Sequence, residues 1–134
     1  MANALYAKGR EKILSGAVNF LADTIKVALI KADYAQNLVS DEFFTSIAAS
    51  VLNTPQTLTG KSVTAGVFDA ADTVFPVVTA GDTSEGLVIY KDTGVAGTSP
   101  LLVYIDNLTG FPFTTNGSTL TIEWDNGAFK IFSL

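Results

Sequence analysis

The sequence contains no cysteine and no histidine, and these two absences exclude much of enzyme chemistry. Without cysteine there are no disulfides, thiol nucleophiles or thiolate metal ligands. Without histidine, serine triads and zinc centres of the usual kind lack a principal component. Charged residues are also few, at 16% of the chain, where about a quarter is typical of a soluble domain. We therefore expect a protein that is not an enzyme, binds no cofactor or metal, and is held together by packing and hydrogen bonds.

Positive charge is scarce as well. Eight Lys and Arg residues face 13 Asp and Glu residues, for a net charge of −5. Nucleic-acid binding requires a basic surface that displaces counterions from phosphates, so we expect no nucleic-acid partner. Lys8, Arg10 and Lys12, with Glu11 among them, are typical of the polar face of a helix. The start of the chain lacks a signal-peptide pattern, and no apolar run approaches the roughly 18 residues of a membrane span. We expect a protein that is made in the cytoplasm and used without crossing a membrane, with no membrane partner.

The first half of the chain predicts a helix and a strand. The helix is expected over Asn3–Leu14, ended by Ser15-Gly16. Thr24–Lys31 alternates apolar side chains on one face and predicts a strand. A short helix is expected from Asp41, with Ser40 as its N-cap, ended by the run 53–55 (Asn-Thr-Pro).

After Pro55 the apolar period becomes two, which predicts strands separated by turns. Asn126-Gly127, inside the run 124–128, favours a tight hairpin. With the early strand this gives about eight strands, a number that suits a two-sheet antiparallel sandwich or jelly roll. We expect one domain overall, with an N-terminal helical segment over 1–16 and a β-sandwich over 17–134. The later strands are expected at Gln56–Thr59, Ser62–Phe68, Thr73–Val78, Gly86–Lys91, Leu101–Ile105, Thr119–Trp124 and Phe129–Ser133.

Three pairs of carboxylates lie close in the sequence, and two of them fall in expected turns. These pairs are Asp69 with Asp72, Asp82 with Glu85, and Glu123 with Asp125. Asp is common in turns for its geometry, and this use explains the first two pairs better than catalysis does. A weak Ca²⁺ site at Asp69–Asp72 stays open, because a hard cation needs only oxygen ligands. The EF-hand spacing is absent, and we assign no metal site.

Phe111-Pro112-Phe113 lies outside any clear expected strand. Two aromatic rings around a proline form an apolar loop, which either contacts a partner or packs on the core of its own domain. Both interpretations stay open from the sequence.

Six short stretches spread along the chain resemble one group of proteins. They are residues 4–16 (ALYAKGREKILSG), 23–30 (DTIKVALI), 58–61 (LTGK), 88–94 (VIYKDTG), 99–106 (SPLLVYID) and 122–132 (IEWDNGAFKIF). Together they resemble small structural proteins that tailed bacteriophages encode beside the major capsid protein. Members of this family with a role look like head decoration, or cement, proteins.

The resemblance implies a jelly-roll-like domain that clamps capsid subunits from outside the virion shell, often as a homotrimer. The expected partner is the major capsid protein, and many copies on one shell would stabilise its assembled state by mass action. We expect contacts through Leu5, Tyr6 and Arg10 and through Phe111, Pro112 and Phe113. The alternative is a tail or baseplate module, for example one that binds a receptor or glycan, since a fold does not fix function.

Overall fold

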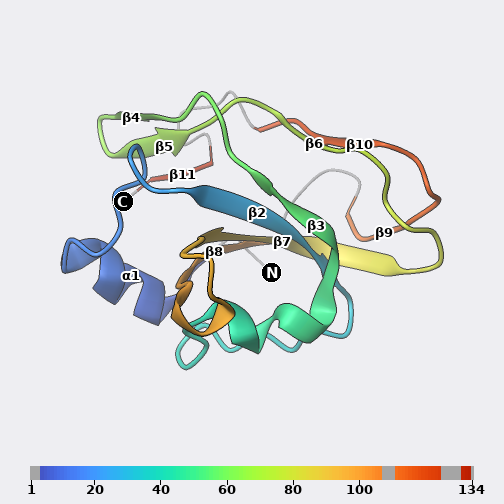
Figure 1. The fold of residues 1–134 in the computed structure, drawn as a ribbon, viewed down its shortest axis with the longest axis horizontal. Coiled ribbons are helices and arrows are strands. Elements are labelled where there is room, and N and C mark those ends of the chain that lie inside the picture. The colour runs from blue at the N-terminus through green and yellow to red at the C-terminus, as the bar shows by residue number, and fades with distance from the viewer. Residues whose placement is uncertain (1–3, 107–110, 125–130, 134) are drawn as a thin grey trace.

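The computed structural model describes residues 4–106, 111–124 and 131–133. The chain forms a mainly β structure with one short N-terminal helix, as expected from the sequence (Figure 1). The elements are β1 (Ala4–Leu5), α1 (Ala7–Leu14), β2 (Ile25–Lys31), the 3₁₀ turns η1 (Phe44–Ser46) and η2 (Ala48–Ser50), β3 (Val51–Thr57), β4 (Ser62–Thr64), β5 (Val67–Asp69), β6 (Thr73–Phe75), β7 (Thr83–Lys91), η3 (Ala96–Thr98), β8 (Leu101–Ile105), β9 (Phe113–Thr114), β10 (Leu120–Ile122) and β11 (Phe132–Ser133).

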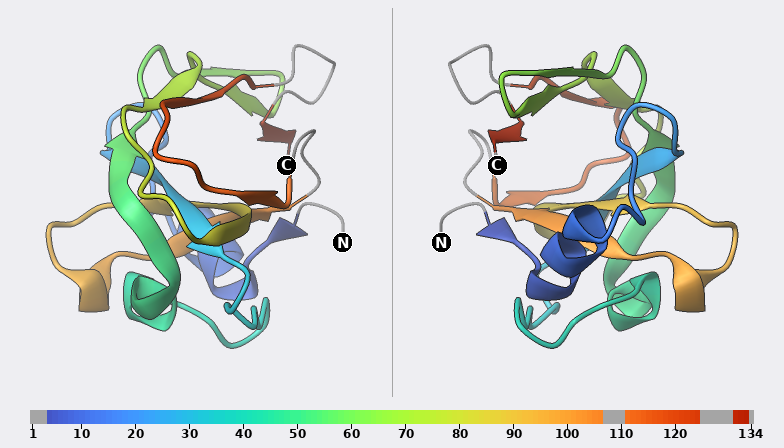
Figure 2. Two further views of the ribbon diagram at one scale, coloured as in Figure 1. Left: turned by 90° about the vertical axis from the view of Figure 1, so that its right-hand side faces the viewer. Right: turned by 90° about the vertical axis from the view of Figure 1, so that its left-hand side faces the viewer.

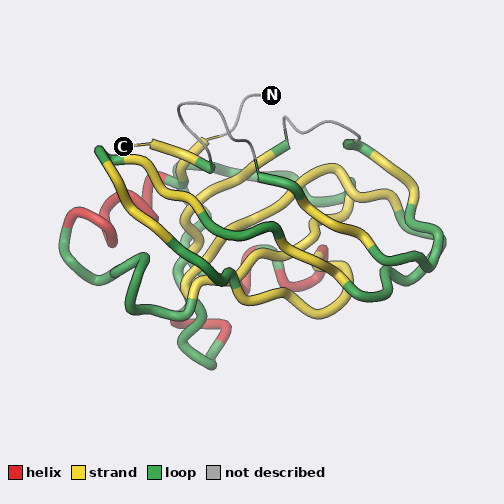
Figure 3. The backbone as a smooth tube through the Cα atoms, turned by 90° about the horizontal axis from the view of Figure 1, so that it is seen from above, coloured by secondary structure: helices red, strands yellow, loops and turns green. Residues whose placement is uncertain are grey.

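An antiparallel sheet with the order β1-β8-β7-β2-β3 forms the centre of the fold, and β9 pairs with the start of β7. Two smaller antiparallel sheets, β10-β6 and β11-β5-β4, lie on one side of it (Figures 1 and 2). Seen from above, α1 lies at one end of the strands (Figure 3). The described strands do not close into a barrel.

The face of the central sheet below the smaller sheets carries the larger apolar core. Ile25, Val27 and Leu29 of β2 point into it, as their alternation predicted. Phe68 of β5 and Trp124 after β10 close it from the other side. These residues are almost fully buried, and each buried aliphatic side chain stabilises the fold by about 1.5–3 kcal/mol.

The opposite face of the central sheet is buried too, because the segment between β2 and β3 folds back over it. Ala28 and Ile30 of β2 point to this side, where Tyr34 and Ile47 cover them. Tyr6, just before α1, completes this second cluster. Both faces of β2 are therefore covered, which explains why its apolar run is nearly continuous.

Two expected helices are shorter or different in kind. The first was expected from Asn3, but Ala4–Leu5 instead pair with Tyr104 and Val103 at the edge of β8. Pairing with β8 gives hydrogen-bond partners to backbone groups that would stay unpaired in the first turn of a longer helix. The second was expected from Asp41 with a Ser40 cap, but the structure has the two turns η1 and η2 there.

Two expected strand boundaries were also wrong. The run 53–55 was expected to end a helix, with a strand from Gln56, but it lies inside β3, whose pairing with β2 is irregular there: Leu29 pairs with Leu52, whereas Val27 pairs with Gln56. Proline has no N–H to donate to the ladder, and an irregular pairing leaves its position without a partner that needs one. The strand expected over Ser62–Phe68 is instead the hairpin β4–β5, turned by Ala65 and Gly66 at φ 52° and 77°. The hairpin expected at Asn126-Gly127 lies outside the described residues.

Candidate contact surface

The three N-terminal residues expected at a contact lie at different depths. Leu5 in β1 is half-buried and packs against the larger core. Tyr6 is 0% exposed, and its backbone N–H donates to the Leu102 carbonyl at 3.0 Å. Arg10 on α1 is exposed. Among these three, Arg10 is the side chain that a partner can reach in this structure, whereas Tyr6 lies beneath the surface.

Tyr6 belongs to a buried polar chain that fastens α1 to the segment after β2. The Tyr6 and Tyr34 hydroxyls are 2.9 Å apart, and the Tyr34 hydroxyl donates to Asp41 Oδ2 at 2.6 Å. Burial raises the pKa of both tyrosines well above the usual range, because an ionised phenolate would lose its solvation. Tyr6 is thus a structural residue that holds a buried hydrogen bond.

The expected aromatic loop packs largely on its own domain. Phe111 is half-buried against the larger core, and its ring meets that of Phe113 edge to face at a centroid distance of 4.9 Å. Phe113 lies in β9 and pairs with Ser84 of β7, so the loop includes a short strand. Pro112 is exposed, and its peptide bond with Phe111 is cis. Packing on the core accounts for Phe111, and Pro112 is the exposed residue of the three.

Two of the carboxylates weighed as catalytic or metal-binding pairs accept hydrogen bonds from backbone or tyrosine groups instead. Asp72 Oδ1 accepts the backbone N–H of Trp124 at 3.1 Å. Glu85 Oε1 accepts the Tyr104 hydroxyl at 3.2 Å. Over the described ranges, no three His, Cys, Asp or Glu side chains gather in a way that could hold a metal ion. The Glu123–Asp125 pair cannot be placed, since Asp125 lies outside those ranges.

Helix α1 lies unusually close to β8, and Gly9 is the reason. A Cβ on Gly9 would overlap the Leu101 carbonyl oxygen and lie 3.0 Å from the Leu102 Cα. On the same side of the helix Ile13 packs against the core. The contact fixes which side of α1 faces inward, so Arg10 and Leu14, four residues apart, share a neighbouring exposed stripe.

Two five-residue turns with the pattern Asn-x-x-x-Asp lie beside the ends of α1. In each, the Asn side chain accepts two backbone N–H groups at 3.1 Å, and the Asp carboxylate accepts the backbone N–H of the Asn. The first residue after each Asn is half-buried, and the second is an exposed apolar residue: Leu21 at 54% and Val39 at 73%. The turns are Asn19–Asp23 and Asn37–Asp41.

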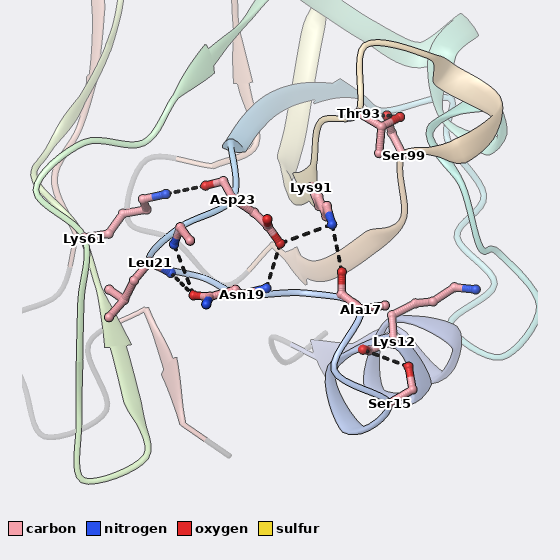
Figure 4. Close-up of polar contacts among 11 residues, drawn as sticks. Lys12, Ser15, Ala17, Asn19, Leu21, Asp23, Lys61, Lys91, Thr93 and Ser99 are labelled. Carbon is pink, nitrogen blue, oxygen red and sulfur yellow. Dashed lines mark hydrogen bonds and ion pairs between the residues drawn. The ribbon is translucent and has the colours of Figure 1, made fainter.

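Lys91 at the end of β7 and Lys61 just before β4 fasten the first turn to the fold (Figure 4). Lys91 Nζ lies 3.2 Å from Asp23 Oδ2 and donates to the Ala17 carbonyl at 2.8 Å, while Lys61 donates to the Asp23 carbonyl. The hydrogen bond from the Asn19 backbone, with smaller contributions from the two lysines, holds the pKa of the Asp23 carboxyl below its usual range. This turn is therefore held in place before any partner binds.

A shallow groove of about 260 Å³ runs between β3 and β6. Its lining is uncharged and consists of Asn53, Thr54, Gln56, Phe75, Pro76 and Val77. The Asn53 amide donates to the Val77 carbonyl at 2.7 Å and accepts the Thr79 N–H at 3.1 Å, so it joins the two walls. With its polar groups used in this way, the groove offers few free groups to a ligand.

No family model and no curated protein matches this sequence.

Sequence reasoning missed most of the exposed apolar residues that the structure places around α1. Leu14 at the end of the helix is 86% exposed, and Leu21 and Val39 are the tips of the two turns. The repeated Asn-x-x-x-Asp spacing was the signal that could have found the tips, because both side chains favour local backbone hydrogen bonds. Over the described residues, no helix is long and apolar enough to cross a membrane.

Proposed function

We propose that this chain is a structural virion protein that binds the outer surface of a phage capsid and stabilises it by bridging major capsid protein subunits. The observation that carries the proposal is the exposure of Leu14, Leu21 and Val39 around α1, on a helix and turns that are rigidly held. Exposed apolar side chains on a helix and turns that are tied to the fold favour contact with another macromolecule. The resemblance to phage decoration proteins supplies the partner.

The uses of the polar side chains support a non-enzymatic role. Asp72 and Glu85, which were weighed as catalytic acids, accept hydrogen bonds from the protein's own groups. Burial keeps Tyr6, Tyr34 and Tyr104 protonated, and their hydroxyls are bonded to each other or to carboxylates. These groups support the fold, and the proposal gives none of them a chemical step.

The finer architecture belongs to the same proposal. The resemblance implies a jelly roll and a homotrimer, and the packing of two small antiparallel sheets on one face of the central sheet supports a sandwich-like arrangement. An experimental structure that traces the whole chain tests the jelly roll, and sedimentation equilibrium tests the trimer.

Co-sedimentation of the purified protein with mature heads that lack it tests the function. Saturable binding at hundreds of copies per head, in a fixed multiple of three per facet, is the expected result. Absence of binding to heads contradicts the proposal.

The second candidate is a tail or baseplate module, for example one that binds a receptor or glycan, since a fold does not fix function. Binding to fractionated tails in tens of copies or fewer, without binding to heads, would support this candidate over the first.

A further inference from the structure

The loop between β9 and β10 contains an Asn-Gly pair whose side chain and backbone can react with each other. Asn116 and Gly117 are both exposed, and Gly117 has a φ of 81°. The Asn116 Oδ1 accepts the backbone N–H of Ser118 at 3.1 Å. The backbone N–H of Gly117 donates no hydrogen bond within the described part of the chain. The nitrogen that lies next to the Asn116 side chain in the sequence is therefore not held in a hydrogen bond.

The hydrogen bond from Ser118 holds the reacting atoms near each other. The ring that it closes contains the Asn116 Cγ, Cβ, Cα and carbonyl carbon and the Gly117 nitrogen, which are the ring atoms of a succinimide. A turn that already keeps these atoms together removes part of the entropy cost of closing the succinimide ring. The same Ser118 N–H points at Oδ1, where negative charge develops as the nitrogen attacks Cγ, and so it stabilises the transition state.

Two other asparagines show what distinguishes this position. Asn19 and Asn37 also accept the backbone N–H groups of the residues two and three ahead, at 3.1 Å. The residues that follow them are Phe20 and Leu38, whose half-buried side chains hinder the approach of the backbone nitrogen to Cγ. Glycine has no Cβ and leaves this approach open. Asn116 therefore combines the turn with the following glycine.

We propose that Asn116 is a self-modification site, which converts to aspartate and isoaspartate without an enzyme. The Gly117 nitrogen loses its proton to solvent base and bonds to the Asn116 Cγ, and the carboxamide C–N bond breaks, so that ammonia leaves. Water then opens the succinimide. Breaking the bond between the Gly117 nitrogen and Cγ gives aspartate on an unchanged backbone. Breaking the bond between that nitrogen and the main-chain carbonyl carbon gives isoaspartate, in which the backbone runs through Cβ and Cγ.

The two products differ in their effect on the fold, although both add one negative charge to a chain of net −5. Isoaspartate lengthens the backbone between Thr115 and Ser118, and both residues are bonded to the loop before β7. The Thr115 N–H donates to the Asp82 carbonyl at 2.7 Å, and the Val78 N–H donates to the Ser118 carbonyl at 3.1 Å. A longer main chain cannot keep both bonds in this geometry. We therefore expect the isoaspartyl form to melt at a lower temperature than the Asn116→Asp variant.

The test follows the mass of one peptide while the full-length protein is incubated at pH 8. Cleavage after glutamate releases residues 86–123, which contain Asn116 and exclude the second Asn-Gly pair at 126–127. Deamidation raises the mass of this peptide by one unit, fragmentation locates the change, and enzymatic methylation of isoaspartate measures that product. We expect the increase at Asn116 in the wild type. We expect none at this position in Asn116→Gln, whose longer side chain would have to close a larger ring.

The rates in folded protein and in protein unfolded by guanidinium test the role of the turn. We expect folded Asn116 to react at least as fast as unfolded Asn116, and at least tenfold faster than Asn19 and Asn37 in the same folded sample. Ser118→Pro removes the N–H that supports Oδ1 and should slow the folded reaction at least threefold, with thermal unfolding as the folding control. A folded rate tenfold below the unfolded rate, or equal rates at Asn116 and Asn19, would overturn the proposal. If Ser118→Pro does not fold, the comparison of folded with unfolded wild type still decides.

Discussion

Replacing Gly9 by alanine should destabilise the protein, although the same change stabilises most helices. In the interior of a solvated helix, alanine is favoured over glycine by about 1 kcal/mol. At Gly9, however, the added Cβ would overlap the Leu101 carbonyl oxygen and press on the Leu102 Cα at 3.0 Å. Both obstacles are backbone atoms of β8, so neither can rotate away. The helix must shift as a body, which disturbs the hydrogen bond between the Tyr6 N–H and the Leu102 carbonyl.

The expected net effect follows from comparing the two terms. Overpacking costs about 1–3 kcal/mol, and a clash with fixed backbone belongs at the upper end of that range. Subtracting the helix-propensity gain leaves a loss of about 2 kcal/mol. At about 2.1 cal/mol/K of unfolding entropy per residue, this loss lowers the melting temperature of a chain of this size by about 7 °C.

Urea unfolding followed by fluorescence of the single tryptophan, Trp124, measures the change. Gly97→Ala is the matched control, because no atom lies within 4 Å of its added Cβ. The control should be neutral or stabilising by up to about 1 kcal/mol. If Gly9→Ala is as stable as the wild type or more so, α1 does not lie against β8 as the structure has it, and the inward side of the helix has been assigned wrongly.

Three further substitutions test other parts of the structure. Asn53 has a φ of 58° and bonds the loop after β6 through its amide; urea unfolding should find Asn53→Ala about 1 kcal/mol less stable than Asn53→Gly, because both lose the amide and only glycine accepts that φ without strain. Tyr34→Phe removes the hydroxyl that donates to Asp41 at 2.6 Å, and thermal unfolding should show a loss of about 1.5–3 kcal/mol, since the acceptor is charged; an unchanged midpoint would contradict the bond. The lowered pKa of Asp23 contributes stability above the unfolded pKa of about 3.9, which is lost as the pH falls through the lower folded value. The free energy of unfolding, measured from pH 7 to 2, should therefore fall less steeply at the acid end for Asp23→Asn than for the wild type, because the variant has already lost the ion pair with Lys91. Equally steep declines in the two proteins would refute the assignment.

The central strands could be predicted from the sequence because their signals are local. The alternation from Ile25 to Leu29 placed β2 correctly, and the run Leu101–Ile105 was confirmed as β8 to the residue. A short helix before Ser15-Gly16 was also confirmed, with a later start than expected. In each case the periodicity of the apolar residues and the turn residues beside them indicate the same element.

The segment between β2 and β3 could not be predicted in the same way, because a side chain decides its course. Asp41 was interpreted as a first-turn acid of a helix. In the structure its carboxylate binds the backbone N–H of Asn37 and the hydroxyl of Tyr34, which fixes a turn instead. The hairpin at Ala65 was missed for a related reason, since alanine at positive φ carries no turn signal.

The contact residues were harder to choose than the strands, and α1 shows why. Tyr6, Gly9 and Ile13 are spaced by three and four residues and lie on one stripe of the helix segment, which the structure turns toward β8 and the core. Hydropathy gives Gly9 almost no weight, so Tyr6 was grouped with Arg10 and Leu5 as if all three faced a partner. Gly9 is the position where the backbones of α1 and β8 come closest, so the side of the helix that faces inward is the one that contains Gly9. Arg10 and Leu14 then lie on the neighbouring exposed stripe, where a partner can reach them, whereas Tyr6 is buried.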